Sequence, residues 1–227
     1  MDCKRDGIKV MNEPGEKCEH ASARATLCSL LAQALNYPDR DLVDSLCRGE
    51  YLPAMLAALK ALGIPGPEKD LKALQKACTA PKLDRAALLL EIEKDYTWMC
   101  FASKPHRLVY LFESVYNEGK LYDESTFAIA RLYYEAGLKL DEDFRLPPDH
   151  IAVELEFMAF LSFKEMEGLK TGDARIADYA ALLQKKTLDE HLRNFALNVA
   201  ERLGRHAGTS FYRGIAQVMT AYFSHPT

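Results

Sequence analysis

One stretch of the chain, residues 146–167, constrains the fold more than any other part of the sequence. It reads LPPDHIAVELEFMAFLSFKEME, and its apolar positions occupy nearly every side of a helix rather than a single stripe. A helix of this kind is normally buried at the centre of a protein. Pro148 can begin it, because a missing N–H costs nothing in the first turn of a helix. We therefore expect a central helix that contributes Leu155, Met158 and Leu161 to the core.

The start of this helix carries polar side chains that a buried position does not explain. They are Asp149, His150, Glu154 and Glu156. A carboxylate in the first turn suits the helix dipole, and polar groups in a buried helix need partners or a function. We expect Asp149 to present an accessible carboxylate at the helix end.

Charge is unevenly distributed along the chain. The 227 residues carry a formal charge of −4, but residues 113–167 contain five Lys and Arg against thirteen Asp and Glu. The acidity therefore belongs to the middle of the chain, and nucleic acid is not expected as a partner. No apolar run reaches the ~20 residues of a membrane span, and the N-terminus has no apolar signal-peptide region. These features predict a cytoplasmic protein without stable membrane insertion, in which the six cysteines are reduced thiols.

Helical periodicity and turn residues divide most of the chain into helices. Residues 1–20 are expected to form a flexible leader, because Pro14 and Gly15 interrupt any periodicity. Residues 102–123 are less regular and are expected to form a packed, aromatic connector. The helices are expected at residues 22–36, 39–48, 51–62, 68–78, 84–101, 125–136, 148–167, 173–186, 188–204 and 208–224. The sequence thus predicts an all-α, single-domain helical bundle of roughly ten helices over residues 21–227.

Catalytic chemistry has little support in the sequence. His150 and Glu154 are four residues apart and could share a metal ion, with His106 as a third ligand. The same pair could equally satisfy each other by a hydrogen bond at a helix start. No nucleophile elbow, dinucleotide-binding turn or paired-histidine zinc helix is present. We expect no catalytic residue, no metal and no cofactor.

A peptide-binding function fits the residues better. Carboxylates pair with guanidinium groups in a fork geometry, and aromatic side chains accept apolar ones. An acidic middle beside an aromatic connector would therefore suit a peptide that carries both arginines and an apolar stretch. The alternative is that the acidic residues are only a solvated surface.

Several motifs resemble the TorD family of cytoplasmic chaperones for molybdenum redox enzymes, which includes the TorD, DmsD and NarJ types. The most specific is the run PPDHIAVELEFMAFL from Pro147. Other matching segments are ESVY from Glu113, RLYYEAGL from Arg131, EKDYTWMCF from Glu93, EHL from Glu190 and FY at Phe211. Asn194 and Phe195 stand where a tryptophan often follows the His-Leu pair in the family. The likeness extends from about Thr26 to Phe223.

The resemblance implies a chaperone that binds the twin-arginine signal peptide, or the N-terminus, of an apo-molybdoenzyme catalytic subunit. Clients of the family resemble DMSO, TMAO or nitrate reductases, and the chaperone assists cofactor insertion and proofreading before export. The family's peptide-binding turn corresponds here to Pro148, Asp149 and His150. Our own interpretation extends the expected site to Glu154, Glu156, Tyr110, Phe112 and Tyr116. The protein is expected to be a monomer or homodimer; the alternatives are a metal-dependent helical enzyme and a non-catalytic subunit of a redox complex.

Overall fold

The computed structural model describes residues 14–102, 107–139 and 146–225, and these consist of helices, their connections and one isolated β-bridge. The all-α prediction is confirmed. The first six helices are α1 (Pro14–Leu35), α2 (Arg40–Arg48), α3 (Tyr51–Ala61), α4 (Glu68–Cys78), α5 (Arg85–Cys100) and α6 (Glu113–Asn117). They are followed by α7 (Glu124–Glu135), α8 (Ile151–Thr171), α9 (Ala174–Thr187), the π-helical turn η1 (Leu188–Leu192), α10 (Arg193–His206) and α11 (Ser210–Ser224).

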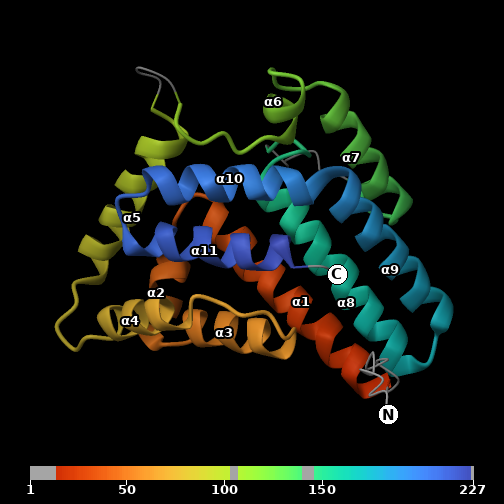
Figure 1. Cartoon of the computed structure of the whole chain (residues 1–227), viewed down its shortest axis with the longest axis horizontal. Helices are drawn as coiled ribbons and strands as arrows, with labels where there is room; N and C mark the ends of the chain where they lie inside the picture. Colours follow the sequence, from red (N-terminus) through yellow and green to blue (C-terminus); the bar gives the residue numbers. More distant parts are fainter. Residues whose placement is uncertain (1–13, 103–106, 140–145, 226–227) are drawn as a thin grey trace, which may run out of the picture.

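Helix α8 lies at the centre of the molecule, as expected. It packs along α1 on one side and α9 on the other, and α10 and α11 lie across α1 and α8 (Figure 1). Leu155, Met158 and Leu161 are at most 2% exposed, which confirms their prediction as core residues.

Two hydrophobic clusters share α8. The larger one contains Leu155 and Met158 and joins α8 to α1–α5, α10 and α11. The smaller one contains Val153, Phe157 and Leu161 and joins α8 to α7 and α9. Residues on different sides of α8 belong to different clusters. This explains why the helix is apolar on nearly every side.

The start of α8 differs from the expectation. The helix begins at Ile151 rather than at Pro148, and His150 is its N-cap, with Nδ1 accepting the N–H of Ala152 at 3.2 Å. Asp149 therefore lies before the helix and not in its first turn. The reason is local: the N–H of His150 bonds to the carbonyl of Pro147, which closes a turn ahead of the helix.

The first helix is longer than expected. Helix α1 begins at Pro14, so residues 14–20 belong to a helix and the prediction of a leader is wrong for them. Pro14 occupies a helix start, where proline is tolerated, and so it does not interrupt the helix. Residues 1–13 of the expected leader lie outside the described residues.

Helices α9 and α10 are joined without a break. The five-residue π-turn η1 connects them, where the sequence predicted two separate helices. A π-turn adds a residue to one helical turn and so changes which side chains point inward. Here it buries Leu188, His191 and Leu192.

Within the described ranges, no helix has the length and apolar character needed to span a membrane.

Candidate functional site

The connector and the start of α8 form one unit. Residues 107–112, which we call the strap, run antiparallel to residues 149–151, with a β-bridge between Phe112 and His150. The N–H of Glu113 bonds to the carbonyl of Asp149 at 3.0 Å, and the N–H of Ile151 bonds to the carbonyl of Leu111 at 2.9 Å. The ring centroids of Phe112 and His150 are 5.2 Å apart in an edge-to-face arrangement. These contacts hold the strap against the start of the central helix.

Three carboxylates are buried beneath this unit. Glu113, Asp149 and Glu154 are each at most 1% exposed. Asp149 Oδ2 accepts the N–H of Ser114 at 3.0 Å, and Glu113 Oε2 lies 2.9 Å from His191 Nδ1. Among the described residues, Asp149 Oδ1 and both carboxylate oxygens of Glu154 have no hydrogen-bond partner. Buried acceptors without partners are rare because each costs about 1–3 kcal/mol.

Burial shifts the protonation of two of these side chains. It raises the pKa of Glu154 well above its ordinary value, and the neighbouring carboxylates of Glu113 and Asp149 raise it further. Burial lowers the pKa of His150 to about 4, although the charge of Asp149 opposes the shift. Burial therefore favours the protonated form of Glu154, and His150 is neutral around neutral pH. A neutral imidazole is what the N-cap bond of His150 requires, because Nδ1 must keep a lone pair.

The structure corrects two expectations about the acidic residues. Asp149 is 0% exposed, so its carboxylate is not accessible at a helix end. The reason is that it accepts the N–H of Ser114, at the start of α6, across the strap. Glu156 points to a different side of α8, where Asn36 Nδ2 donates to it at 3.4 Å, and it does not join the other predicted residues.

The aromatic residues of the expected site do come together. Tyr110, Phe112 and Tyr116 are each partly exposed, as is Pro148. The hydroxyl of Tyr116 donates to the carbonyl of Tyr110 at 3.0 Å, and their rings meet edge to face. The strap therefore presents aromatic side chains outward while the acids of the predicted site lie beneath it.

The expected metal pair is not arranged as a metal site. His150 uses Nδ1 as the helix cap, and in the described parts of the chain no group of three His, Cys, Asp or Glu side chains is placed to hold an ion. The proposed third ligand, His106, lies outside the described residues.

One protein-family model matches the part of the chain that contains this site. The family model described as nitrate reductase delta subunit matches residues 51–201, which include the strap, the buried acids and α8. The chain belongs to this TorD and NarJ family. The family resemblance seen in the sequence is confirmed.

Individual relatives are more distant. The chain is similar to proteins named "Chaperone protein TorD": 24% identical over 144 residues to that of Vibrio parahaemolyticus and 34% identical over 98 residues to that of Escherichia coli O45:K1. The first match covers 61% of this chain and 64% of the relative, and the second covers 43% and 46%. The chain thus spans less than two thirds of the relatives that it matches. A crystal structure from Archaeoglobus fulgidus, of a protein assigned to redox enzyme maturation, has 23% sequence identity and a TM-score of 0.38, and covers 80% of this chain and 98% of that one.

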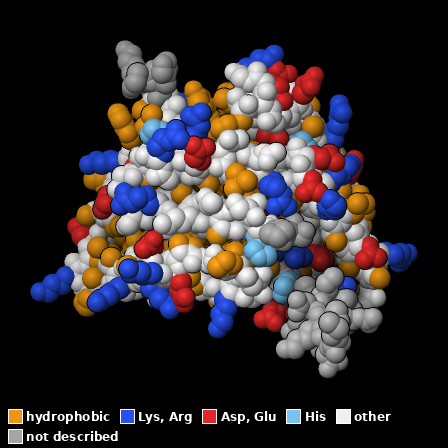
Figure 2. All heavy atoms as spheres, in the orientation of Figure 1, with side chains coloured by type: hydrophobic (Ala, Val, Ile, Leu, Met, Phe, Trp, Pro, Cys, Tyr) orange, Lys and Arg blue, Asp and Glu red, His pale blue; other side chains and the backbone are white. Residues whose placement is uncertain are grey.

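A second surface of this family member lies next to the strap and was missed from the sequence. Residues 118–127, which we call the tip, comprise the link from α6 to α7 and the first turn of α7. They lie at the top of the molecule, where Figure 2 shows acidic side chains gathered. Tyr122 and Phe127 are 62% and 59% exposed. The prediction that this part of the connector packs onto the body is therefore wrong for Tyr122. The feature of the sequence that indicated this surface is the excess of Asp and Glu over Lys and Arg in residues 113–167.

The backbone and charges of the tip are unusual in two respects. Tyr122 has a φ of 60°, a left-handed conformation that costs of order 1 kcal/mol or more for a bulky residue and often marks a functional site. Glu118 accepts the hydroxyl of Ser125 at 2.7 Å through Oε1, but its buried Oε2 has no partner among the described residues. The tip carries three acids, Glu118, Asp123 and Glu124, against one lysine.

The strap itself is flanked by basic groups. The guanidinium of Arg202 lies over the rings of Tyr110 and Tyr116, at 5.9 and 5.6 Å from their centroids, and Arg107 lies 5.8 Å from that of Tyr110. An incoming arginine would be repelled there. The tip, rather than the strap, therefore offers the environment that a cationic group favours.

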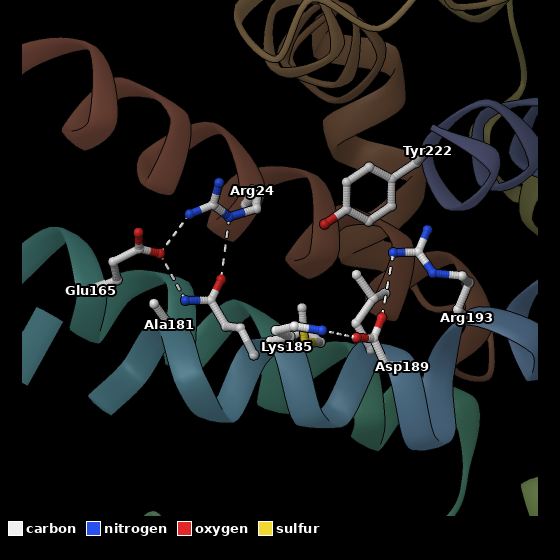
Figure 3. A pocket seen from close by; sticks show the side chains of 10 residues that line it. Arg24, Glu165, Ala181, Lys185, Asp189, Arg193 and Tyr222 are labelled. Carbon is white, nitrogen blue, oxygen red and sulfur yellow. Dashed lines mark hydrogen bonds and ion pairs between the residues drawn. The ribbon is translucent and has the colours of Figure 1, made fainter. Parts of the chain in front are cut away.

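A pocket of about 380 Å³ lies on another part of the molecule, between α1, α8, α9 and α11 (Figure 3). Its charged groups are already engaged with one another: Arg24 donates to Glu165 at 2.5 Å and to Gln184 at 3.2 Å, and Lys185 pairs with Asp189. This pairing leaves little unsatisfied polarity for a ligand.

Proposed function

We propose that this protein is a cytoplasmic maturation chaperone that binds the twin-arginine signal peptide or N-terminus of a molybdenum-containing oxidoreductase. It would hold the apo-enzyme while the cofactor is inserted and delay export until then. Membership of the TorD and NarJ family carries this proposal, and the relatives named as TorD chaperones support it.

The tip is the part of the surface that we propose for the arginines of the client peptide. The exposed carboxylate of Glu124 could accept a guanidinium group, and the exposed rings of Tyr122 and Phe127 could stack on the guanidinium plane or cover apolar side chains. The aromatic strap, with Phe112 and Pro148, would then support the apolar part of the peptide. The buried residues Asp149, His150 and Glu154 would act by holding the strap in place rather than by touching the peptide.

Titration calorimetry with a twin-arginine signal peptide tests this assignment. Glu124→Lys reverses an exposed charge at the tip and should weaken binding at least tenfold, which corresponds to about 1.4 kcal/mol. Tyr122→Ala should weaken it as well. Because the Tyr122 side chain is largely exposed, this variant should keep the wild-type melting curve. Glu19→Lys makes the same charge change at an exposed site on α1 and should leave binding unchanged.

Two outcomes would count against the proposal in different ways. Unchanged affinity in both tip variants would remove the tip from the site while leaving the chaperone function intact. Failure of the wild-type protein to bind any oxidoreductase N-terminus would reject the function itself.

A non-catalytic subunit of a redox complex is the second candidate function, because the matching family model is described by a subunit name. Pulldown of the mature, cofactor-loaded oxidoreductase distinguishes the two. A subunit would remain with the mature enzyme, whereas a chaperone would be found only with the immature form.

A further inference from the structure

A groove of about 880 Å³ lies between α3 and α4, on a part of the molecule that the candidate site does not use. Figure 1 shows these two helices at the lower left, whereas the tip is at the top. The α3 wall of the groove presents Pro53, Leu56 and Ala57, whose spacing places them on one face of the helix. Pro53 and Ala57 are exposed, and Leu56 is half-buried. The groove therefore has an apolar wall that is open to solvent.

The turn between α3 and α4 gives one end of this groove a fixed shape. The N–H of Ile64 bonds to the carbonyl of Leu59 at 2.9 Å, and the Ile64 side chain is buried. Pro65 and Pro67 restrict the backbone on either side of Gly66. A groove that is already formed loses less entropy when a partner binds.

The charge of this region is positive. Residues 51–83 carry five lysines against two acids, and Figure 2 shows Lys and Arg side chains beside hydrophobic ones at the lower left. Glu68 lines the groove, but Lys72 pairs with it at 2.7 Å. The hydrogen bond and charge of Lys72, and then the charge of Lys60, hold the pKa of Glu68 below its ordinary value. Lys60 lines the groove from α3 and forms no ion pair with the described residues, so its charge is left in excess.

The α4 wall of the groove adds an unsatisfied acceptor. Gln75 lines the groove, and its buried Oε1 has no hydrogen-bond partner in the described parts of the chain. Buried acceptors without partners are rare, because water no longer satisfies them. A partner that brings an N–H or O–H group to Gln75 would therefore gain affinity.

These properties restrict what can occupy the groove. A basic partner would be repelled by Lys60, and a purely apolar one would bury Lys60 and Gln75 without compensation. A bilayer surface is broad and cannot follow a concave groove of this size. The partner must therefore be narrow, apolar on one side and acidic beside it.

We propose that the α3–α4 groove binds an acidic amphipathic helix of another protein. Its apolar side chains would lie on the α3 wall, and its carboxylates would pair with Lys60. A polar side chain of the same helix would donate to Gln75 Oε1. This site is separate from the tip and does not require the client peptide that we propose there.

Two synthetic helical peptides test the proposal, with one leucine stripe in common and either glutamate or lysine at the flanking positions. Fluorescence anisotropy with the full chain should show binding of the glutamate peptide only. Lys60→Glu should weaken that binding by about tenfold or more, because it replaces attraction by repulsion. Ala57→Asp should weaken it too, because it places a charge on the apolar wall. Lys82→Glu makes the same charge change at an exposed site outside the groove and should leave the affinity unchanged, as should Glu124→Lys at the tip.

Melting curves establish that the variants fold, which their exposed positions favour. Equal binding of the two peptides, or binding of neither, would overturn the proposal. So would a folded Lys60→Glu protein that binds the glutamate peptide as tightly as the wild type. Sedimentation with vesicles of phosphatidylcholine and phosphatidylglycerol provides the other arm. Vesicle binding that Lys60→Glu abolishes, without binding of the glutamate peptide, would reject the helix and assign the surface to a membrane.

Discussion

At the scale of single residues, the start of α8 combines two buried groups that respond to pH in opposite directions. Burial raises the pKa of Glu154 above that of an exposed glutamic acid and lowers the pKa of His150 below that of an exposed histidine, so the fold disfavours the charged form of both. The groups around them come from several elements: Glu113 from α6, Tyr133 from α7, Asp149 from the turn and His191 from η1. The stability of the fold should therefore decline on both sides of a pH optimum, and each decline can be removed separately.

Glu154→Gln should stabilise the protein, with a larger gain at pH 8 than at pH 5. The folded-state pKa of Glu154 lies above its unfolded value, so the unfolded chain releases a proton that the folded chain retains, and stability falls as pH rises above about 4.5. Glutamine keeps the shape of a protonated glutamic acid and carries no such penalty. Its amide can also donate to a neighbouring carboxylate. Thermal melts at both pH values test this, with the exposed Glu91→Gln as the control; equal gains at the two pH values would contradict it.

His150→Asn should reduce the loss of stability in acid. The pKa of His150 is lowered to about 4 by burial, so between pH 6.5 and 4 the unfolded chain takes up a proton that the folded chain does not, and stability falls by up to about 1.4 kcal/mol per pH unit. Asparagine can also cap a helix and has no charge to gain. Urea titrations at pH 7 and pH 5 should show a smaller difference for the variant than for the wild type. His20→Asn, on α1 one turn before the Arg24 that pairs with Glu165 and so away from the start of α8, should retain the wild-type difference.

At the scale of whole elements, one glycine decides how closely two helices approach. The central helix was expected to end at residue 167, but Gly168 lies inside α8, and a Cβ there would lie 2.6 Å from the backbone nitrogen of Ala177 in α9. Real Cβ atoms do not approach backbone so closely, and backbone in a packed helix cannot move away cheaply. Gly172 instead ends α8, with a φ of 72°.

Gly168→Ala should therefore destabilise the fold by about 1–3 kcal/mol, as is typical of overpacking. Gly204→Ala is the matched control, because Gly204 also lies inside a helix but its nearest neighbour to a new Cβ is Ala216 Cβ at 3.7 Å. There the usual gain of about 0.5–1 kcal/mol for replacing a helical glycine should appear. Denaturant unfolding of the two variants measures both effects, and a gain at Gly168 would show that α8 and α9 can separate easily.

Most of the elements could be predicted because their causes are local. Helices α2, α4, α5 and α7 begin and end within about one residue of the predicted positions, at caps such as Asp39, Asp84 and Asp123. The elements that were missed depend on distant contacts. Helix α6 is only five residues long, and the carboxylate that accepts the N–H of Ser114 belongs to Asp149, 35 residues further on.

The same reason explains which parts of the candidate site were missed. Phe112 and His150 lie side by side, and their proximity could be expected because both belong to the aromatic connector and the helix start that the sequence makes visible. The burial of Asp149 was not visible, because it results from the strap folding back over the turn. Nor does periodicity distinguish the π-turn η1 from an ordinary helix junction, although this turn places His191 beside Glu113.

At the scale of the whole molecule, α8 raises the question of whether its two hydrophobic clusters unfold together. Leu155 belongs to the cluster with α1 and α11, and Leu161 to the cluster with α7 and α9. Both are nearly fully buried, so truncation of either to alanine should cost about 2–5 kcal/mol. A single-domain bundle predicts that both losses are transmitted to the whole chain, because the same helix supports both clusters.

Leu155→Ala and Leu161→Ala should then each lower one common melting temperature. Far-ultraviolet circular dichroism reports on all helices, whereas Trp98 fluorescence reports on α5, which does not contribute to the smaller cluster. The two signals should coincide in both variants, because unfolding of α7 and α9 would expose one side of α8 and remove support from the larger cluster. A Leu161→Ala protein whose circular dichroism falls in two steps, with the Trp98 signal following only the second, would show that α7, α8 and α9 unfold as a separate unit. In that case the prediction of a single cooperative bundle would be wrong, and the tip, which leads into α7, would belong to the less stable part.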